Sequence, residues 1–267
     1  MSPPVGLWAE QKYRLIHNYS KIFATSMKNR WGARVYIDLF AGAGISLIKD
    51  TSRKVLTSPM LALDIPDKFD KYIFCELDPA NLDALQQRVE RKYSNTVNVQ
   101  YIQGDANLMT DKIVESIPSH SKSFTVMSFC FLDPFKAENL CFSTIEAISK
   151  KYIDFLILVP IGMDMNRTKE LDNKNIDKFV GTPEWRDQWK AAKEKNIAFD
   201  IFFTDYYQKR MKSLKYCYGG YSEIVRSTIK NLPLYRLGFF SRHPLGQKIW
   251  EEAKKYSTRQ TSFSFFK

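Results

Sequence analysis

The stretch Val35-Tyr36-Ile37-Asp38-Leu39-Phe40-Ala41-Gly42-Ala43-Gly44 decides how the rest of the chain is interpreted. Its β-branched and aromatic start favours a buried strand. The apolar run stops at Asp38, and the residues from Ala41 to Gly44 have almost no side chains. Such a turn lets the backbone approach a ligand closely, with its N–H groups pointing outward. We therefore predict a strand that runs into a ligand-binding turn.

Four further apolar runs follow the opening strand, and segments with helical spacing separate them. These runs cover residues 72–76, 97–102, 124–132 and 153–159. The alternation predicts a doubly wound α/β fold with a mostly parallel sheet, and the nearly continuous run 124–132 is typical of a central strand buried on both faces. Ligands of such sheets bind beyond the carboxyl ends of the strands. Four acids fall there: Asp38, Glu76, Asp105 and Asp133.

The pattern divides the chain into a main domain and an insertion. Residues 1–160 and 221–267 form the expected Rossmann-like domain, which opens with a covering helix near 7–30 and ends with a hairpin over 225–241 and a helix near 245–256. Between them, residues 161–220 are dense in charge and contain Trp185 and Trp189 four apart. We predict a mainly helical insertion that is a candidate for substrate recognition. Instead of contributing to substrate recognition, the two tryptophans could form a small core of the insertion itself.

The charge of the chain points to a polyanionic partner. Lys and Arg number 40 against 29 Asp and Glu, which gives +11 at pH 7 and a pI near 9.3. An excess of this size suits nucleic acid, although a generally basic protein is the alternative. Residues 206–218 interleave aromatic and basic side chains and form the best candidate surface.

Composition also narrows the other possibilities. The four cysteines and three histidines are scattered, so we predict no metal site. The N-terminus does not read as a signal peptide, and no apolar run approaches about 18 residues. We therefore expect a cytoplasmic protein without a membrane partner.

The acids at the predicted strand ends suit an adenosine ligand. Glu76 stands where a carboxylate accepts from both ribose hydroxyls. Asp105 can accept from the adenine amine, and Ala106 allows close contact. A nicotinamide cofactor would need a third glycine where Leu47 stands, and the chain has no phosphate-binding Gly-Lys-Ser/Thr motif.

The turn Asp133-Pro134-Phe135 is the predicted catalytic element. A carboxylate and a backbone carbonyl near Pro134 can accept from both N–H groups of an exocyclic amine and so direct its lone pair at a methyl donor. Phe135 can stack on a flipped-out base. The alternative is an ordinary Asp-Pro turn after a strand.

These motifs resemble those of class I S-adenosylmethionine-dependent methyltransferases, and more narrowly the three-Cys-motif partner (TcmP) family. The segments that carry the resemblance are Trp8 with Lys12 and Tyr19, 36–44, Ser58-Pro59, 76–78, 104–107, 131–135 and 242–246. The resemblance implies a seven-stranded sheet with an antiparallel last strand, the cofactor S-adenosyl-L-methionine, and a neighbour protein of the radical S-adenosylmethionine type. The expected cofactor-binding residues are Asp38, Phe40, Ala41, Gly42, Gly44, Glu76, Leu77, Asp105 and Ala106.

Three functions remain open from the sequence. The first is methylation of an exocyclic amine of a base. Asp133-Pro134-Phe135 is similar both to the Asp-Pro-Pro-Tyr of DNA amino-methyltransferases and to the Asp-Pro-Phe of tRNA guanine dimethyltransferases, which leaves DNA and RNA open. The second is a non-catalytic adaptor for the three-Cys partner, and methylation of a small molecule or protein is a third reading. The predicted substrate-binding residues are Lys12, Arg167, Tyr207, Arg210, Arg242 and His243.

Overall fold

The computed structural model describes residues 5–6, 9–49, 51, 53–94, 96–161, 174–222, 224–226 and 233–259, without the side chains of 258 and 259. Arg167 and Trp8, which the sequence analysis singled out, lie outside these ranges. Within them, no helix is long and apolar enough to cross a membrane.

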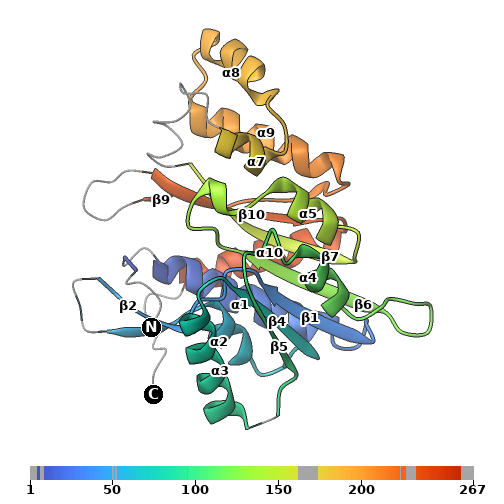
Figure 1. Ribbon diagram of the computed structural model, residues 1–267. Coiled ribbons are helices and arrows are strands. Elements are labelled where there is room, and N and C mark those ends of the chain that lie inside the picture. The colour runs from blue at the N-terminus through green and yellow to red at the C-terminus, as the bar shows by residue number, and fades with distance from the viewer. Residues whose placement is uncertain are drawn as a thin grey trace.

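A mainly parallel sheet forms the centre of the molecule (Figure 1). Among the described residues, seven strands follow one path and an eighth, β9 (Val225–Arg226), pairs with β10. The path runs β5 (Val99–Gln103), β4 (Lys71–Glu76), β1 (Ala33–Asp38), β6 (Val126–Leu132), β7 (Ile153–Pro160), β10 (Pro233–Ser241) and β8 (Tyr218–Tyr221). Neighbours from β5 to β7 are parallel, whereas β10 is antiparallel to both β7 and β8. The predicted fold class is confirmed.

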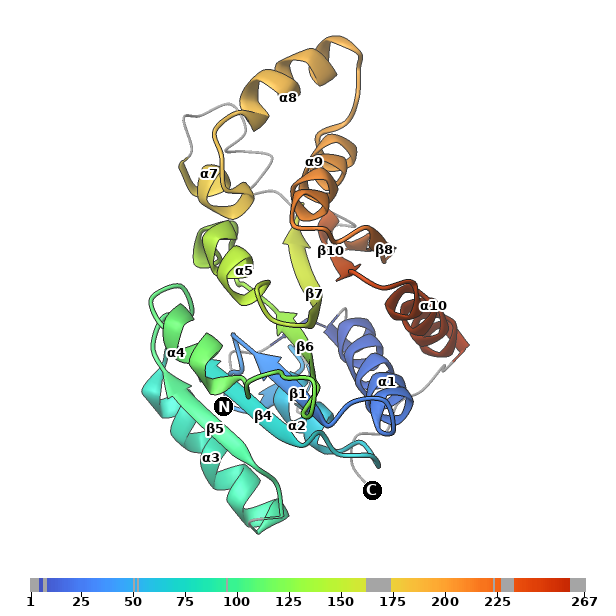
Figure 2. The same ribbon diagram turned by 90° about the vertical axis from the view of Figure 1, so that its right-hand side faces the viewer.

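Helices cover both faces of this sheet (Figure 2). The core on one face includes residues of α1 (Ala9–Met27), α2 (Ser58–Leu63), α3 (Pro79–Tyr93) and α10 (Pro244–Arg259). The core on the other face includes residues of α4 (Thr110–Ser116), α5 (Phe142–Ile148), α7 (Lys174–Val180), α8 (Trp185–Glu194) and α9 (Phe199–Ser213).

Side chains of the central strands alternate between the two cores, as the period of a strand requires. In β1, Val35 and Ile37 join one core and Tyr36 joins the other. In β6, Cys130 belongs to the first core and Phe129 to the second. Because both faces are covered, these strands are mostly apolar, and that is why the sequence revealed them.

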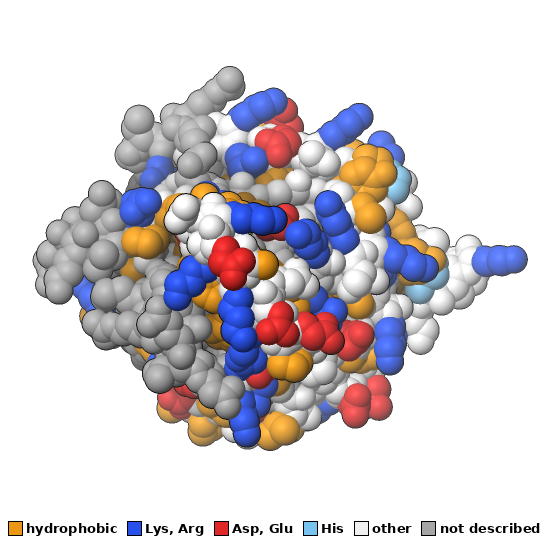
Figure 3. Space-filling view, turned by 90° about the horizontal axis from the view of Figure 1, so that it is seen from above, with side chains coloured by type: hydrophobic (Ala, Val, Ile, Leu, Met, Phe, Trp, Pro, Cys, Tyr) orange, Lys and Arg blue, Asp and Glu red, His pale blue; other side chains and the backbone are white. Residues whose placement is uncertain are grey.

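The insertion does not form a core of its own. Trp185 and Trp189 are buried against Phe199 at 6.4 and 5.1 Å between ring centroids, and their cluster continues into the core beside α5. In the predicted surface 206–218, Tyr206, Tyr207 and Tyr216 are buried and cannot stack on bases, whereas Tyr218 is half-buried. Figure 3, which looks down on the end carrying α8, shows basic side chains mixed with acidic ones.

Two local features follow the opening turn. The first is a separate hairpin of β2 (Ile45–Leu47) and β3 (Lys54–Leu56). The second is the start of α2, where Ser58 is the first helical residue and Thr57 occupies the cap position without a side-chain bond. The hydroxyl of Ser58 instead hydrogen-bonds Asp38.

Candidate functional site

The opening turn depends on two glycines with left-handed backbone. Gly42 has φ 62° and Gly44 has φ 80°. A Cβ at Gly44 would lie 2.8 Å from both Leu85 and Met60, so a larger residue is strained there and also lacks space. The Ala41 N–H donates to the Cys75 carbonyl at 3.0 Å, which fastens the turn to the end of β4.

Glu76 meets this turn directly. Its Oε2 accepts from the Gly42 N–H at 2.7 Å, and its Oε1 accepts from the Asp78 N–H at 2.9 Å. A carboxylate offers about four acceptor positions, so each oxygen can still accept a hydroxyl. Leu77 follows with 63% of its surface exposed. A carboxylate beside a small-residue turn and an exposed apolar side chain fits the ribose and one face of adenine.

Asp105 occupies the corresponding place after β5. Its Oδ1 accepts from the Asn107 N–H at 2.7 Å, and the Gly104 N–H donates to the Glu76 carbonyl at 3.0 Å, which joins the two strand ends. Ala106 is buried. Leu108, with 80% of its surface exposed, was not anticipated. Its position directly after the Gly104–Asn107 turn is the sequence feature that could have identified Leu108 as a candidate site residue.

Asp38 lies beneath the turn and is fully buried. Its Oδ1 accepts from the Phe40 N–H at 3.2 Å, and Tyr36 donates to its Oδ2 at 3.4 Å. Burial raises the pKa of Asp38 to about 7, because the hydrogen bonds from Ser58 and Phe40 offset only part of the desolvation and nearby Asp133 and Glu76 add negative charge. A ligand carrying positive charge would favour its ionised form.

Lys12 reaches the catalytic candidate from α1. Its Nζ lies 2.5 Å from Asp133 Oδ2, and the two side chains are 6% and 20% exposed. Burial is the largest single influence and would lower the pKa of Lys12, but Asp133, Tyr13 and Tyr235 together outweigh it, and the pKa is raised. Lys12 is therefore a charged partner of Asp133. The sequence analysis had instead predicted that Lys12 binds substrate.

The rest of this turn has the exposure that base stacking requires. Pro134 is buried, whereas Phe135 is 88% exposed. A single large apolar ring left in solvent is unremarkable, but this one adjoins a paired carboxylate at the carboxyl end of the central strand β6.

The remaining predicted substrate residues do not gather at these acids. Tyr207 is fully buried, and Arg210 donates to the Val180 carbonyl at 2.8 Å while lying 4.6 Å over the Phe142 ring. Arg242 and His243 lie at the opposite end of the sheet, because antiparallel β10 ends beside the start of β7.

His243 belongs to a helix start. Its Nδ1 accepts from the Leu245 N–H at 3.1 Å, and Ser241 Oγ accepts from its own N–H at 3.1 Å. Arg242-His243-Pro244 is therefore the turn that begins α10. Within the described residues, no cluster of His, Cys, Asp or Glu could hold a metal ion.

Comparison with known proteins gives a fold and no family. No family model and no curated protein matches the sequence. Among solved structures, protein LPL1258 from Legionella pneumophila, described by the family model DUF519, aligns with a TM-score of 0.53 and 13% identity over 92% of this chain and 91% of that one. At that identity the likeness establishes the fold alone.

Two methyltransferase structures align more distantly. An O-methyltransferase from Bacillus cereus in complex with SAH has a TM-score of 0.44 and 12% identity over 83% of this chain and 80% of that one. A putative caffeoyl-CoA O-methyltransferase from Staphylococcus aureus has a TM-score of 0.41 and 11% identity over 82% of each chain.

Proposed function

We propose that this chain is an S-adenosyl-L-methionine-dependent methyltransferase that methylates an exocyclic amino group of a base in DNA or RNA. The carrying observation is the meeting of the turn, Glu76 and the ion-paired Asp133 at the carboxyl ends of adjacent strands, with Phe135 exposed beside them. This arrangement supplies both a nucleoside site and an acceptor for an amine.

The residues fit the cofactor by their chemistry. Glu76 would accept from the ribose hydroxyls, while Leu77 and Leu108 would cover the adenine. Asp105 would accept from the adenine amine. The buried Asp38 would support the positively charged methionine end through the turn above it. When bound, the cofactor supplies an activated methyl group.

The ion pair defines what Asp133 does. Lys12 engages Oδ2, which leaves Oδ1 as the oxygen that would accept from substrate. Because Asp133 is charged in this pair, it accepts hydrogen bonds and cannot donate one. An amine that donates to Oδ1 and to a backbone carbonyl of the turn has its lone pair turned toward the methyl donor. Lys12 thus acts as a positioning residue for Asp133.

Cofactor binding is tested by calorimetry with S-adenosyl-L-methionine. Micromolar binding is expected of the native chain. Charge-assisted hydrogen bonds are worth about 1.5–3 kcal/mol, so Glu76→Ala should weaken binding by about ten- to a hundredfold. Unchanged affinity in Glu76→Ala would reject the ribose assignment.

The substrate is tested by nucleoside mass spectrometry of DNA and RNA from cells with and without the gene. A methylated amino-nucleoside that disappears with the gene, and returns with the native chain but not with Asp133→Ala, supports the proposal. Transfer by Asp133→Ala at the native rate would reject the role of Asp133. Methylation confined to protein or small molecules would reject the substrate class.

We further propose TcmP membership and a three-Cys partner of the radical S-adenosylmethionine type, on the motif order described above. A pull-down of that partner by the tagged chain tests this. If the partner binds without cofactor and no nucleic acid accepts a labelled methyl group, the chain is an adaptor and the methyltransferase proposal fails.

A further inference from the structure

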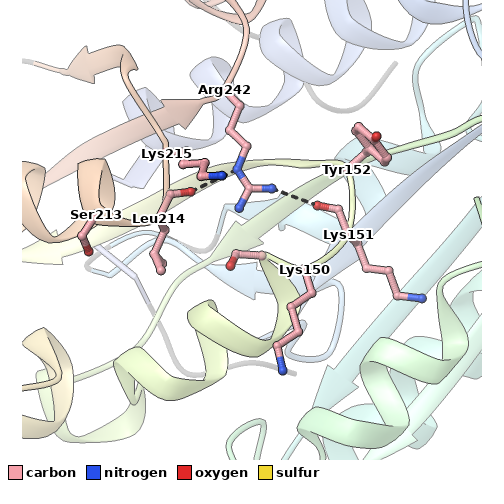
Figure 4. A pocket seen from close by; sticks show the side chains of 8 residues that line it. Lys150, Lys151, Tyr152, Ser213, Leu214, Lys215 and Arg242 are labelled. Atoms are coloured by element: carbon pink, nitrogen blue, oxygen red, sulfur yellow. Dashed lines mark hydrogen bonds between the residues drawn. The ribbon is translucent and has the colours of Figure 1, made fainter.

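A groove lies at the end of the sheet opposite to the acids. It joins two cavities of about 610 and 340 Å³, which share Lys150, Lys151 and Tyr152. Lys215 and Arg242 line the larger cavity (Figure 4), and His120 lines the smaller one. We call these six residues the amino-end groove, because they surround the start of β7.

The charge of this groove is positive and largely uncompensated. Neither cavity is lined by an acid. Within the described part of the chain, no ion pair involves Lys150, Lys151 or Lys215. The C-termini of α5 and α9 oppose them with about half a negative charge each.

Asp154 also lies close enough to interact with Arg242, but it is buried, and burial raises its pKa to about 7. The four cations outweigh these contributions and leave roughly two to three positive charges facing solvent.

Arg242 is fixed in place by backbone groups. Its Nε donates to the Leu214 carbonyl at 3.1 Å and its Nη1 to the Lys151 carbonyl at 3.4 Å, as the dashed lines in Figure 4 mark. The guanidinium lies 4.4 Å over the Tyr216 ring. Of five guanidinium N–H donors, three remain for a ligand, and their direction is set in advance. Planar, preorganised donors of this kind suit phosphate.

Lys215 holds an unusual backbone conformation at the same groove. It follows α9 with φ 70°, at the position after a helix where glycine is usual. A side chain there costs on the order of 1 kcal/mol. A lysine in place of glycine therefore adds a cation to the groove at a small cost in stability.

An aromatic cluster extends the groove. Tyr152 is 55% exposed, and its ring lies 4.3 Å from that of His120 and 5.9 Å from that of Trp31 between centroids. These two neighbours pack against the tyrosine ring, while its exposed part lies in the groove that Lys151 also lines. A supported, half-exposed ring beside cations suits an unpaired base next to its phosphate. Inorganic phosphate would make no use of it.

We propose that the amino-end groove binds single-stranded nucleic acid, with phosphates on Lys150, Lys151, Lys215 and Arg242 and an unpaired base on Tyr152. The groove and Asp133 lie at opposite ends of β6, whose seven residues span roughly 23 Å at about 3.3 Å each. The groove is thus a binding surface separate from the proposed methyl-transfer site, and its occupancy needs neither cofactor nor methyl transfer.

The test measures binding without cofactor, by fluorescence anisotropy over a salt series. The probes are labelled oligo(U) and oligo(dT) of about 20 nucleotides, longer than a typical single-strand site. The triple variant Lys150→Gln/Lys151→Gln/Lys215→Gly removes three cations. Each lost phosphate contact on a single strand lowers the salt slope by about 0.7. We expect a slope reduced by about 2 and at least tenfold weaker binding near physiological salt.

The matched control is Lys190→Gln/Lys193→Gln/Lys195→Gln, which makes the same charge change on and just after α8. Near-native binding is expected. Equal loss in both triple variants would mean that net charge alone attracts the probe, and would overturn the proposal. Lys215→Gly alone should weaken binding without lowering the melting temperature, because glycine suits that backbone.

Tyr152→Ala tests the base contact and Tyr152→Phe is its control. Base stacking is worth about 1–3 kcal/mol, so alanine should weaken binding by about five- to a hundredfold and phenylalanine should restore it. Equal binding by the native chain and both Tyr152 variants would overturn the assignment of a base to Tyr152.

A further experiment measures binding to vesicles of phosphatidylserine and phosphatidylcholine. Vesicle binding lost in the groove variant, with oligonucleotide binding intact, would assign the groove to a membrane and overturn the proposal.

Discussion

The two ends of the sheet carry opposite charge in different surroundings. At the carboxyl ends, acids predominate, and the nearby cation Lys12 is buried against Asp133. At the amino ends, cations predominate, and the nearby acid Asp154 is buried under Arg242. The Lys12–Asp133 pair is compensated and largely buried, whereas Lys150, Lys151 and Lys215 line open cavities and have no ion-pair partner among the described residues.

This difference teaches how one sheet can divide two tasks. Buried, compensated groups keep a fixed geometry, which alignment of a reacting atom requires. Exposed, uncompensated cations can bind a polyanion in many positions, and salt lowers the affinity of that binding. The comparison therefore predicts that variants at one end leave the other end's function intact.

The largest expected effect comes from breaking the Lys12–Asp133 pair. Asp133→Asn should lower methyl transfer at least about a hundredfold, because the amine loses its charged acceptor and its alignment. It should also destabilise the chain, since removing one partner of a buried pair costs about 3–5 kcal/mol. Thermal melts and a labelled-methyl assay measure the two effects.

Lys12→Met and the double variant complete the cycle. The double variant should recover part of the lost stability but none of the activity. Full additivity in the melts would contradict the coupling of the two side chains.

A second prediction compares the two ends directly. Glu76→Ala should lower affinity for S-adenosyl-L-methionine about ten- to a hundredfold while leaving anisotropy with oligo(U) unchanged. The groove triple variant should do the opposite. Glu76→Gln, which keeps the shape and loses the charge, is the matched control and should fall between. If either variant changed both readouts alike, the separation of the two ends would be wrong.

The third prediction uses the two buried aspartates, one at each end, whose pKa values burial raises to about 7. An unfolded aspartate titrates near pH 4, so between about pH 4 and 7 the folded chain binds the additional protons. Stability should therefore fall as pH rises through that window. In Asp38→Asn and in Asp154→Asn, the free energy of unfolding should decrease by a few kcal/mol less over this pH range than it does in the native chain. Denaturation at several pH values measures this.

Cofactor binding distinguishes the two aspartates. A positively charged cofactor favours ionised Asp38, so affinity should rise between pH 6 and 8, by less than tenfold per unit. Asp38→Asn should flatten this rise, whereas Asp154→Asn should keep it. A flat native profile would show that Asp38 does not sense the cofactor.

The smallest effect is expected at the start of α10. His243→Ala removes the acceptor for the Leu245 N–H and should cost about 0.5–2 kcal/mol, as loss of a helix cap does. Methyl transfer and cofactor affinity should stay native, since His243 lies far from Asp133. His243→Asn can accept the same hydrogen bond and should recover most of the stability. A large loss of activity in His243→Ala would contradict this expectation and support the sequence-based prediction that His243 binds substrate.

Several features were readable in the sequence because they are local. The strand at 35–38 is apolar on both faces, the turn after it needs small residues, and acids follow the strands that point the same way. Parallel strands bring their carboxyl ends to one edge, so Asp38, Glu76, Asp105 and Asp133 could be grouped before their distances were known. The helical nature of the insertion was readable for the same reason.

Other features depend on contacts between distant segments. Whether Tyr207 faces solvent is decided by Phe179 and Phe240 packing against it. The pairing of Lys12 with Asp133 joins residues 121 positions apart, and spacing along α1 cannot reveal it.

By itself, the sequence determined a doubly wound fold, its acidic strand ends and a basic net charge. Only the tertiary structure decided where that positive charge lies. Antiparallel β10 carries Arg242 away from the acids to the start of β7, where Lys150, Lys151 and Lys215 arrive from two helix ends. Strand direction is fixed by long-range pairing and packing, which residue type and periodicity do not encode. The net charge of the chain therefore could not show that acids and cations lie at opposite ends of the sheet.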